Sequence, residues 1–221
     1  MRMPSAFRKR YTTTRINTVN KILFQALLTC CLFSFIFPTV LPAQTSVEEL
    51  SAEVHAVIDK KIESLRSELA PDPLIVETVR THNEANKDLS VEEIASMDKA
   101  WRNTPGFNDI MKEILLNPCS KRLTEFQEKY DGFAEIFVTD VRGLNVGMTN
   151  RTTDYYQADE DWWIRAFAGD QGQFYYSEIE YDESAMSESI SVYVPVIDPQ
   201  TRKAIGVIKA VLDIVTIRME L

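Results

Sequence analysis

The sequence predicts an α+β domain, with a helical first half followed by a sheet of about five strands. From residue 46 to residue 130, apolar residues recur every three or four positions, which is the period of a helix. After Asp131-Gly132 the pattern changes to the alternation of strands. One short helical stretch interrupts the strands after the second of them. This order of elements defines the fold class.

Residues 1–43 differ from the rest of the chain. Six basic residues and no acidic one lie in residues 1–21, and an apolar run from Ile22 to Leu41 leads to Pro42-Ala43. This pattern predicts a secretory signal peptide cleaved after Ala43, and the alternative is an uncleaved N-terminal anchor. Either reading places residues 44–221, a single domain, in the periplasm or another extracytoplasmic space.

The composition of residues 44–221 limits what the domain does. All 33 acidic residues lie there with 18 of the 24 Lys and Arg, so its net charge is −15 against −9 for the whole chain. Such a charge argues against binding to nucleic acid. Cys119 is its one cysteine, so neither an internal disulfide nor a thiolate metal site is expected. Hydrolase, P-loop and HExxH signatures are absent from the sequence, and we expect no enzyme and no cofactor.

Helix starts are marked by capping patterns. Ser46 with Glu49 and Ser90 with Glu93 have the spacing of capping boxes, and Asp72-Pro73 combines an N-cap with proline at the first helical position. The predicted helices run from 47 to 69, from 73 to 85, from 91 to about 101, from 108 to 116 and from 118 to 130. The first carries a narrow apolar stripe, which is expected to pack within the chain, with a dimer interface as the alternative.

Strands are predicted where apolar residues alternate. Asp140-Val-Arg-Gly143 is a turn signal between the first two strands. Gly169 and Gly172 end the short helix. The predicted strands are 134–139, 145–149, 174–181, 189–197 and 204–214, with the helix at 160–168.

The stretch from Asp154 to Asp182 contains most of the unusual chemistry. It reads DYYQADEDWWIRAFAG and then YYSEIEYD, so tyrosines, a tryptophan pair and acidic residues lie close together. Aromatic faces beside carboxylates suit a pocket for a small polar or cationic ligand. The same residues also suit a strand–helix junction with aromatic core and a solvated acidic rim. Composition leaves both readings open.

DYYQADEDWW, then YDES, SVYVPVID and AIGVIKAVLDI, resemble the Cache family of extracytoplasmic, PAS-like (PDC-type) sensor domains. The resemblance spans roughly residues 72–214. It implies a curved antiparallel sheet with a long N-terminal helix along it, and a small ligand bound between the sheet and the segments that cover it. Such domains pass their signal to a kinase or chemoreceptor module, which the resemblance makes an expected partner here.

The resemblance also implies a set of ligand-binding residues. Tyr155, Trp162, Trp163 and Asp182 match the family's tyrosine, aromatic pair and aspartate, and Tyr181 accompanies the aspartate. Tyr176, on the same predicted strand, completes the candidate set. Glu160 stands where amino-acid-binding members have an arginine that holds a ligand carboxylate. This departure favours an amine, unless Arg142, Arg151 or Arg165 supplies the positive charge.

The sequence therefore predicts an exported small-molecule sensor domain that recognises an amine, an amino acid or a small carboxylate. In this hypothesis Asp182 and Glu160 pair with an ammonium group, and Tyr155, Trp162, Trp163 and Tyr181 enclose it. The alternative function is an interaction module with a vestigial pocket that forms a homodimer through the helix at 47–69.

Overall fold

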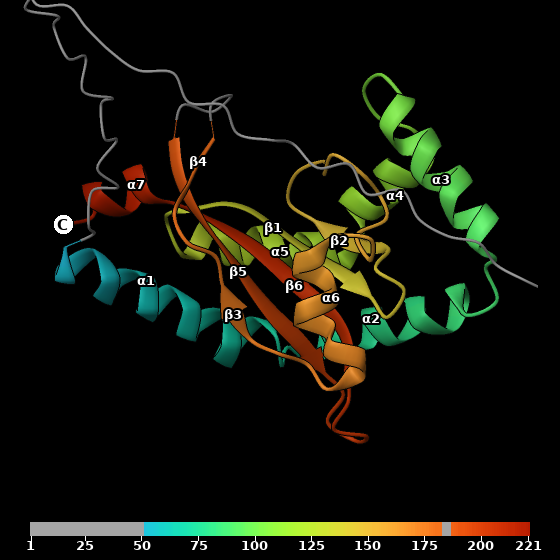
Figure 1. The fold of residues 1–221 in the computed structure, drawn as a ribbon, viewed down its shortest axis with the longest axis horizontal. Coiled ribbons are helices and arrows are strands. Elements are labelled where there is room, and N and C mark those ends of the chain that lie inside the picture. Colours follow the sequence, from blue (N-terminus) through green and yellow to red (C-terminus); the bar gives the residue numbers. More distant parts are fainter. Residues whose placement is uncertain (1–50, 183–186) are drawn as a thin grey trace, which may run out of the picture. The chain divides into compact units, whose positions relative to one another are not determined.

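An antiparallel sheet forms the centre of the domain (Figure 1). The computed structural model describes residues 51–182 and 187–221, without the side chain of Asp182. The strand order is β2-β1-β6-β5-β3, and β4 also pairs with β5. Every pairing is antiparallel, which confirms the predicted α+β fold. The strands are β1 Phe133–Asp140, β2 Asn145–Met148, β3 Tyr175–Tyr176, β4 Glu180–Asp182, β5 Ser187–Ile197 and β6 Ala204–Asp213.

The helices begin largely where the capping patterns place them. Asp72 accepts a hydrogen bond from the Leu74 amide, and Ser90 and Glu93 form the predicted reciprocal capping box. Ser46 and Glu49 lie outside the described residues; Ser51 caps the first helix that the structure describes. The helices are α1 Ala52–Ser64, the π-helical turn η1 Leu65–Leu69, α2 Pro73–Asn86, α3 Val91–Asn103, α4 Asp109–Leu116, α5 Pro118–Lys129, α6 Asp161–Phe167, the 3-10 turn η2 Ala168–Asp170 and α7 Ile214–Met219.

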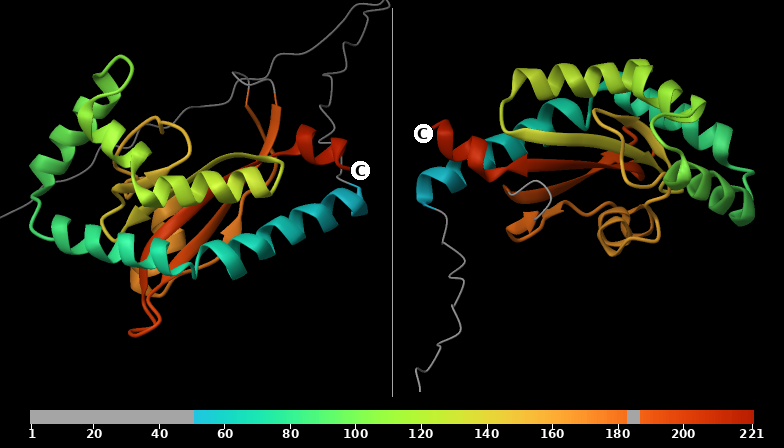
Figure 2. Two further views of the ribbon diagram at one scale, coloured as in Figure 1. Left: turned by 180° about the vertical axis from the view of Figure 1, so that it is seen from behind. Right: turned by 90° about the horizontal axis from the view of Figure 1, so that it is seen from above.

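The two faces of the sheet are covered differently (Figure 2). On one face, alternate residues of the central strands, such as Ile136, Val192 and Ile208, join apolar residues of α1, α2 and α5 in the main core. On the opposite face, α6 lies over β5 and β6 with Trp163 packed near Tyr193. Since side chains of a strand alternate between faces, the residues between the main-core positions point toward α6. This second face contains the site described below.

The apolar stripe of the first helix packs within the chain. Val54, Ile58, Ile62, Leu65 and Leu69 are all buried in the main core. The helix leaves mainly polar side chains exposed in the part that the structure describes. A homodimer through this helix stays a prediction, and it would have to use that polar surface.

Two sequence predictions at the end of the chain need correction. The strand predicted over 174–181 is divided into β3 and β4, because the Ser177 hydroxyl, instead of a backbone carbonyl, accepts the Ser191 amide hydrogen. The strand predicted to reach Ile214 ends at Asp213, whose carboxylate caps α7 through the Val215 amide and the Thr216 hydroxyl. No helix within residues 51–182 and 187–221 is long and apolar enough to cross a membrane.

Gly206 is required by the close approach of β1 and β6. A Cβ atom at this position would lie 2.1 Å from the Thr139 carbonyl oxygen and 3.0 Å from a Val79 methyl group. We expect Gly206→Ala to lower the free energy of unfolding by about 3 kcal/mol, at the upper end of overpacking effects. Urea unfolding measures this. Ser189→Ala, on the adjacent strand β5, is the control and should change stability by less than about 0.5 kcal/mol; equal effects would contradict the close-approach argument.

Candidate functional site

Three residues meet on the sheet face below α6. The registers pair Phe137 of β1 with Lys209 of β6, and Lys209 with Tyr193 of β5. Neighbouring residues at one level of a sheet have side chains on the same face. Lys209 therefore stands between two aromatic side chains.

Trp162 of α6 completes an aromatic cage around this lysine. Its ring stacks on Tyr193 with centroids 5.1 Å apart and meets Phe137 edge-on at 6.0 Å. Lys209 Nζ lies 5.0 Å from the Trp162 ring centroid and 5.9 Å from each of the other two. An ammonium group within about 6 Å of aromatic rings is attracted by their π faces.

The charge of Lys209 is only partly compensated. Burial lowers the pKa of its ammonium group, while the carboxylates of Glu135, Glu160, Glu180 and Asp154 act in the opposite direction. Among the described side chains, however, no carboxylate oxygen lies within 4.0 Å of Nζ, and Nζ donates no hydrogen bond. A half-buried ammonium group without an anionic partner is costly, which makes it a position for a ligand anion.

Lys209 borders a cavity of about 330 Å³ between the sheet and the segment that connects β2 to α6. This volume is at the small end of ligand sites. The carboxylates of Glu135, Asp154 and Glu160 line it together with Lys209 and Arg151. Burial raises the pKa of both the Glu135 and the Asp154 carboxyl groups. The remaining lining residues are Phe137, Thr152, Thr153, Gln157 and Trp162.

The charged groups of this cavity are not equally available to a ligand. Arg151 donates through Nη1 to the Gly106 carbonyl and through Nη2 to the Trp101 carbonyl, both at 2.8 Å, so it holds the loop in place. Asp154 accepts from the Gln157 amide at 2.6 Å. Glu160 is exposed at the N-terminus of α6, and its side chain makes no capping hydrogen bond. Lys209, Glu135 and Glu160 are therefore the charged lining side chains that make no hydrogen bond or ion pair within the described residues.

The connecting segment is held by α3. The buried Asp98 accepts hydrogen bonds through Oδ1 from the backbone amides of Tyr155 and Tyr156, at 3.0 and 3.2 Å. Trp101 donates from Nε1 to the Thr152 carbonyl at 2.9 Å and stacks on Tyr155 with centroids 5.3 Å apart. These contacts fix one wall of the cavity.

The structure does not bring the predicted aromatic box together. Tyr155 is buried against Trp101, and burial raises its pKa. Trp162 and Trp163 are adjacent on α6, where successive side chains point about 100° apart. Trp162 lines the sheet-face cavity, whereas Trp163 stacks on Phe167 and donates from Nε1 to Thr139 Oγ1 at 2.9 Å.

The other predicted residues also separate. Tyr176 and Tyr181 are 52% and 59% exposed and line neither the sheet-face cavity nor the one beside Trp163. The side chain of Asp182 lies outside what the structure describes. Of the predicted residues, Glu160 and Trp162 therefore meet in the sheet-face cavity.

Of the three arginines considered as alternatives, Arg151 lines the sheet-face cavity but is bound to backbone carbonyls, and the other two lie elsewhere. Arg142 donates to backbone carbonyls at the end of α2, and Arg165 lies over the Tyr175 ring at 3.8 Å. The cation of this cavity that donates no hydrogen bond within the described residues is Lys209, which the sequence analysis missed. Its signal was present: Lys209 is the one charged residue between Ala204 and Leu212, in an otherwise apolar strand.

The sequence matches no protein-family model and no curated protein. The fold is similar to the sensor domain of the Vibrio cholerae histidine kinase DctB, at 14% identity and a TM-score of 0.44, over 76% of this chain and 53% of that one. It is also similar to the ligand-binding domain of the Campylobacter jejuni chemoreceptor Tlp3 in complex with 4-methylisoleucine, at 12% identity and a TM-score of 0.35, over 74% and 61% of the two chains.

A third similarity is to the ligand-binding domain of the Pseudomonas aeruginosa amino acid chemoreceptor PctC in complex with GABA, at 14% identity and a TM-score of 0.34, over 67% and 60%. The chain thus spans between about half and three fifths of these solved chains. The structures to which it is similar are sensor and ligand-binding domains of kinases and chemoreceptors, the class of domain that the sequence resembles.

Proposed function

We propose that the chain is an extracytoplasmic sensor domain that binds a small amino-acid-like zwitterion in the sheet-face cavity. The observation that carries this proposal is the ammonium group of Lys209, which lies within the aromatic cage, has no carboxylate oxygen within 4.0 Å among the described side chains, and borders a cavity also lined by Glu160. A ligand carboxylate on Lys209 would replace the missing anion. A ligand ammonium group on Glu160, with Glu135 and Asp154 nearby, would complete the charge match.

This proposal reverses part of the sequence hypothesis. Glu160 still receives an ammonium group, as expected when it replaces the family's arginine. Lys209, from a different strand, takes the carboxylate that the arginine would have held. The proposed ligand is therefore a zwitterion rather than a simple amine. The bound state would be read by a kinase or chemoreceptor partner, by analogy with the family that the sequence resembles.

A matched ligand series tests the charge pattern. L-Leucine, isoamylamine and 4-methylvalerate share a branched apolar skeleton. Leucine carries a positive and a negative charge, isoamylamine carries only the positive charge, and 4-methylvalerate carries only the negative charge. We expect calorimetry on the full-length chain to show that leucine binds at least ten times more tightly than either analogue. Tighter binding of isoamylamine would restore the amine hypothesis, and an absence of binding across amino acids of several sizes would favour the interaction-module alternative.

The affinity for the zwitterion should fall as pH rises, and it should fall before an ordinary lysine would titrate. Only the protonated form of Lys209 attracts a carboxylate, and burial places its pKa below the usual 10.5. The affinity is thus highest below that lowered pKa and falls as the pH rises through it. Dissociation constants measured from pH 7 to pH 10 report the loss.

Lys209→Arg is the control for this pH dependence, because arginine stays protonated over the whole range. Deprotonation of the ligand's own ammonium group affects the wild type and the variant equally. The difference between the two profiles therefore isolates Lys209. Identical profiles would show that the Lys209 ammonium group does not contact the ligand.

A further inference from the structure

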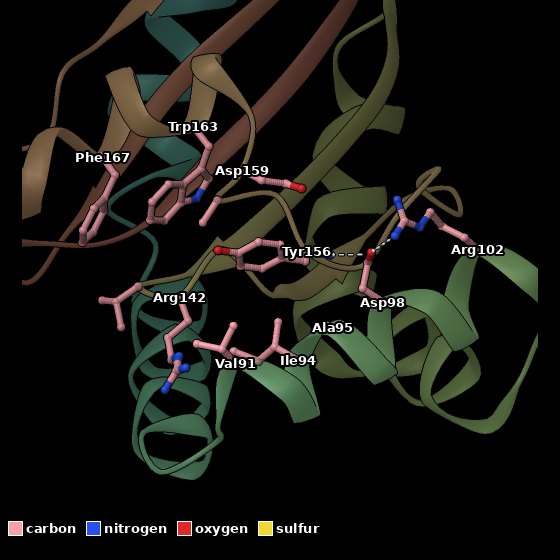
Figure 3. Close-up of a pocket in the computed structure, with 12 residues that line it drawn as sticks. Val91, Ile94, Ala95, Asp98, Arg102, Arg142, Tyr156, Asp159, Trp163 and Phe167 are labelled. Atoms are coloured by element: carbon pink, nitrogen blue, oxygen red, sulfur yellow. Dashed lines mark hydrogen bonds and ion pairs between the residues drawn. The ribbon is translucent and has the colours of Figure 1, made fainter.

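A second cavity, of about 520 Å³, is lined by Trp163 and Phe167 of α6 (Figure 3). Its walls come from α3, from the turn between β1 and β2, from the loop before α6, and from α6 itself. None of its lining residues also lines the sheet-face cavity. The volume lies within the range of small-molecule sites.

Aromatic rings form one side of this second cavity. Trp163 and Phe167 stack with centroids 4.7 Å apart and an interplanar angle of 20°. The ring of Tyr156 projects between them and α3, with its hydroxyl end toward Trp163 (Figure 3). Among the described residues, nothing forms a hydrogen bond with this hydroxyl group. The site therefore offers flat apolar surface and one hydroxyl group that has no hydrogen-bond partner among the described residues.

Two arginines and two aspartates line the cavity, and three of these four side chains make hydrogen bonds or ion pairs with the described residues. Arg102 pairs with Asp98 at 2.7 Å, and Asp98 also accepts two backbone amides. Arg142 donates through Nη1 to the Asn86 and Lys87 carbonyls at 3.4 and 3.1 Å. Asp159 lines the same cavity, and within the described part of the chain no cationic nitrogen lies within 4.0 Å of its carboxylate. Asp159 is thus the charged lining side chain that makes no hydrogen bond or ion pair within the described residues.

We propose that this cavity is a second ligand site and that it binds a small arylalkylamine. The aromatic ring of the ligand packs against Trp163, Phe167 and Tyr156. Its ammonium group pairs with Asp159 and is within the attraction of the aromatic faces. Aromatic stacking and cation pairing together distinguish this ligand class from an aliphatic zwitterion. The proposal does not depend on the function proposed for the sheet-face cavity.

Phenethylamine and 3-phenylpropionate test this site, because they share an aromatic ring on a short chain and carry opposite charges. We expect calorimetry with the full-length chain to show binding of phenethylamine, at least ten times more tightly than 3-phenylpropionate. Asp159→Asn should weaken phenethylamine at least tenfold. No binding of phenethylamine at millimolar concentration, or equal binding of the two compounds, would overturn the proposal.

A pair of tryptophan substitutions on α3 locates the site. Ala95 is exposed and lines the cavity, so Ala95→Trp should fill it and weaken phenethylamine at least tenfold. Ala100 is exposed on the same helix but does not line the cavity, so Ala100→Trp should change the affinity by less than twofold. Equal affinities in the two variants would exclude this location.

Lys209→Met separates the two cavities. Phenethylamine binding should stay within twofold of wild type in this variant, whatever happens to leucine. Loss of phenethylamine binding would instead place the amine in the sheet-face cavity and overturn the proposal. A third outcome is that the wild type binds phenethylamine but not leucine, and that Ala95→Trp weakens phenethylamine binding. This outcome would support the second site and contradict the proposed zwitterion site.

Discussion

Lys209→Met is expected to abolish measurable binding of the zwitterion while leaving the domain folded. Truncating one partner of a buried charge pair costs about 2–5 kcal/mol of binding free energy, or roughly 30- to several-thousand-fold in affinity. The free protein should be at least as stable as wild type, because methionine fills the same space without a desolvated charge. Calorimetry with leucine and urea unfolding measure the two effects in the same preparation.

Lys203→Met is the matched control for this variant. Lys203 precedes β6 on the surface and pairs with Asp170 at 2.6 Å, and it lines neither cavity. The substitution removes the same charge from the chain, so it should leave leucine affinity within twofold. Equal losses in both variants would show that Lys209 acts through overall charge, and unchanged affinity in Lys209→Met would remove the basis of the proposed function.

Trp101→Ala is expected to cause the largest loss of stability, about 3–5 kcal/mol, which is typical of a buried tryptophan. Trp101 is 1% exposed within the second core, which contains Tyr155, Met111 and Ile114. Its loss leaves a large void and removes the hydrogen bond to the Thr152 carbonyl. Urea unfolding monitored by far-ultraviolet circular dichroism measures the change without depending on tryptophan fluorescence.

Trp101→Phe separates the two contributions of this residue. Phenylalanine retains much of the apolar volume but cannot donate to Thr152, so a loss of about 1–3 kcal/mol is expected from the unsatisfied carbonyl and the remaining void. The same loop lines the sheet-face cavity, and both variants should therefore also weaken leucine binding. A Trp101→Ala variant as stable as wild type would contradict the assigned packing.

Local signals in the sequence were sufficient for most of the fold. Capping patterns at Asp72 and Ser90 and the alternation along β5 depend on neighbours a few residues away, so they can be read directly. The division of β3 from β4 could not be predicted, because it depends on Ser177 meeting Ser191 across the sheet. The short helix α7 was missed for a different reason. Its N-cap, Asp213, directly follows a long apolar stretch, and the pattern of that stretch predicts a strand that continues to Ile214.

The candidate site was less accessible from the sequence. Glu160 and Trp162 line the sheet-face cavity, and the sequence analysis selected both. Tyr155 and Trp163 lie near them along the chain but turn into other clusters, because adjacent helical residues diverge and because Asp98 fixes the loop at Tyr155 and Tyr156. The candidates came from one continuous stretch, so they are close in the sequence, but most of them do not lie together in the structure.

The stretch from Asp154 to Asp182, by itself, determined that aromatic and acidic side chains would lie close together along the chain of an α+β domain. Only the tertiary structure decided which of them meet. Strand register placed Lys209, 49 residues after Glu160 in the chain, between Phe137 and Tyr193 and beneath Trp162. Pairing between distant strands is set by the packing of the whole sheet, so no local pattern around Glu160 reveals the cation beside it.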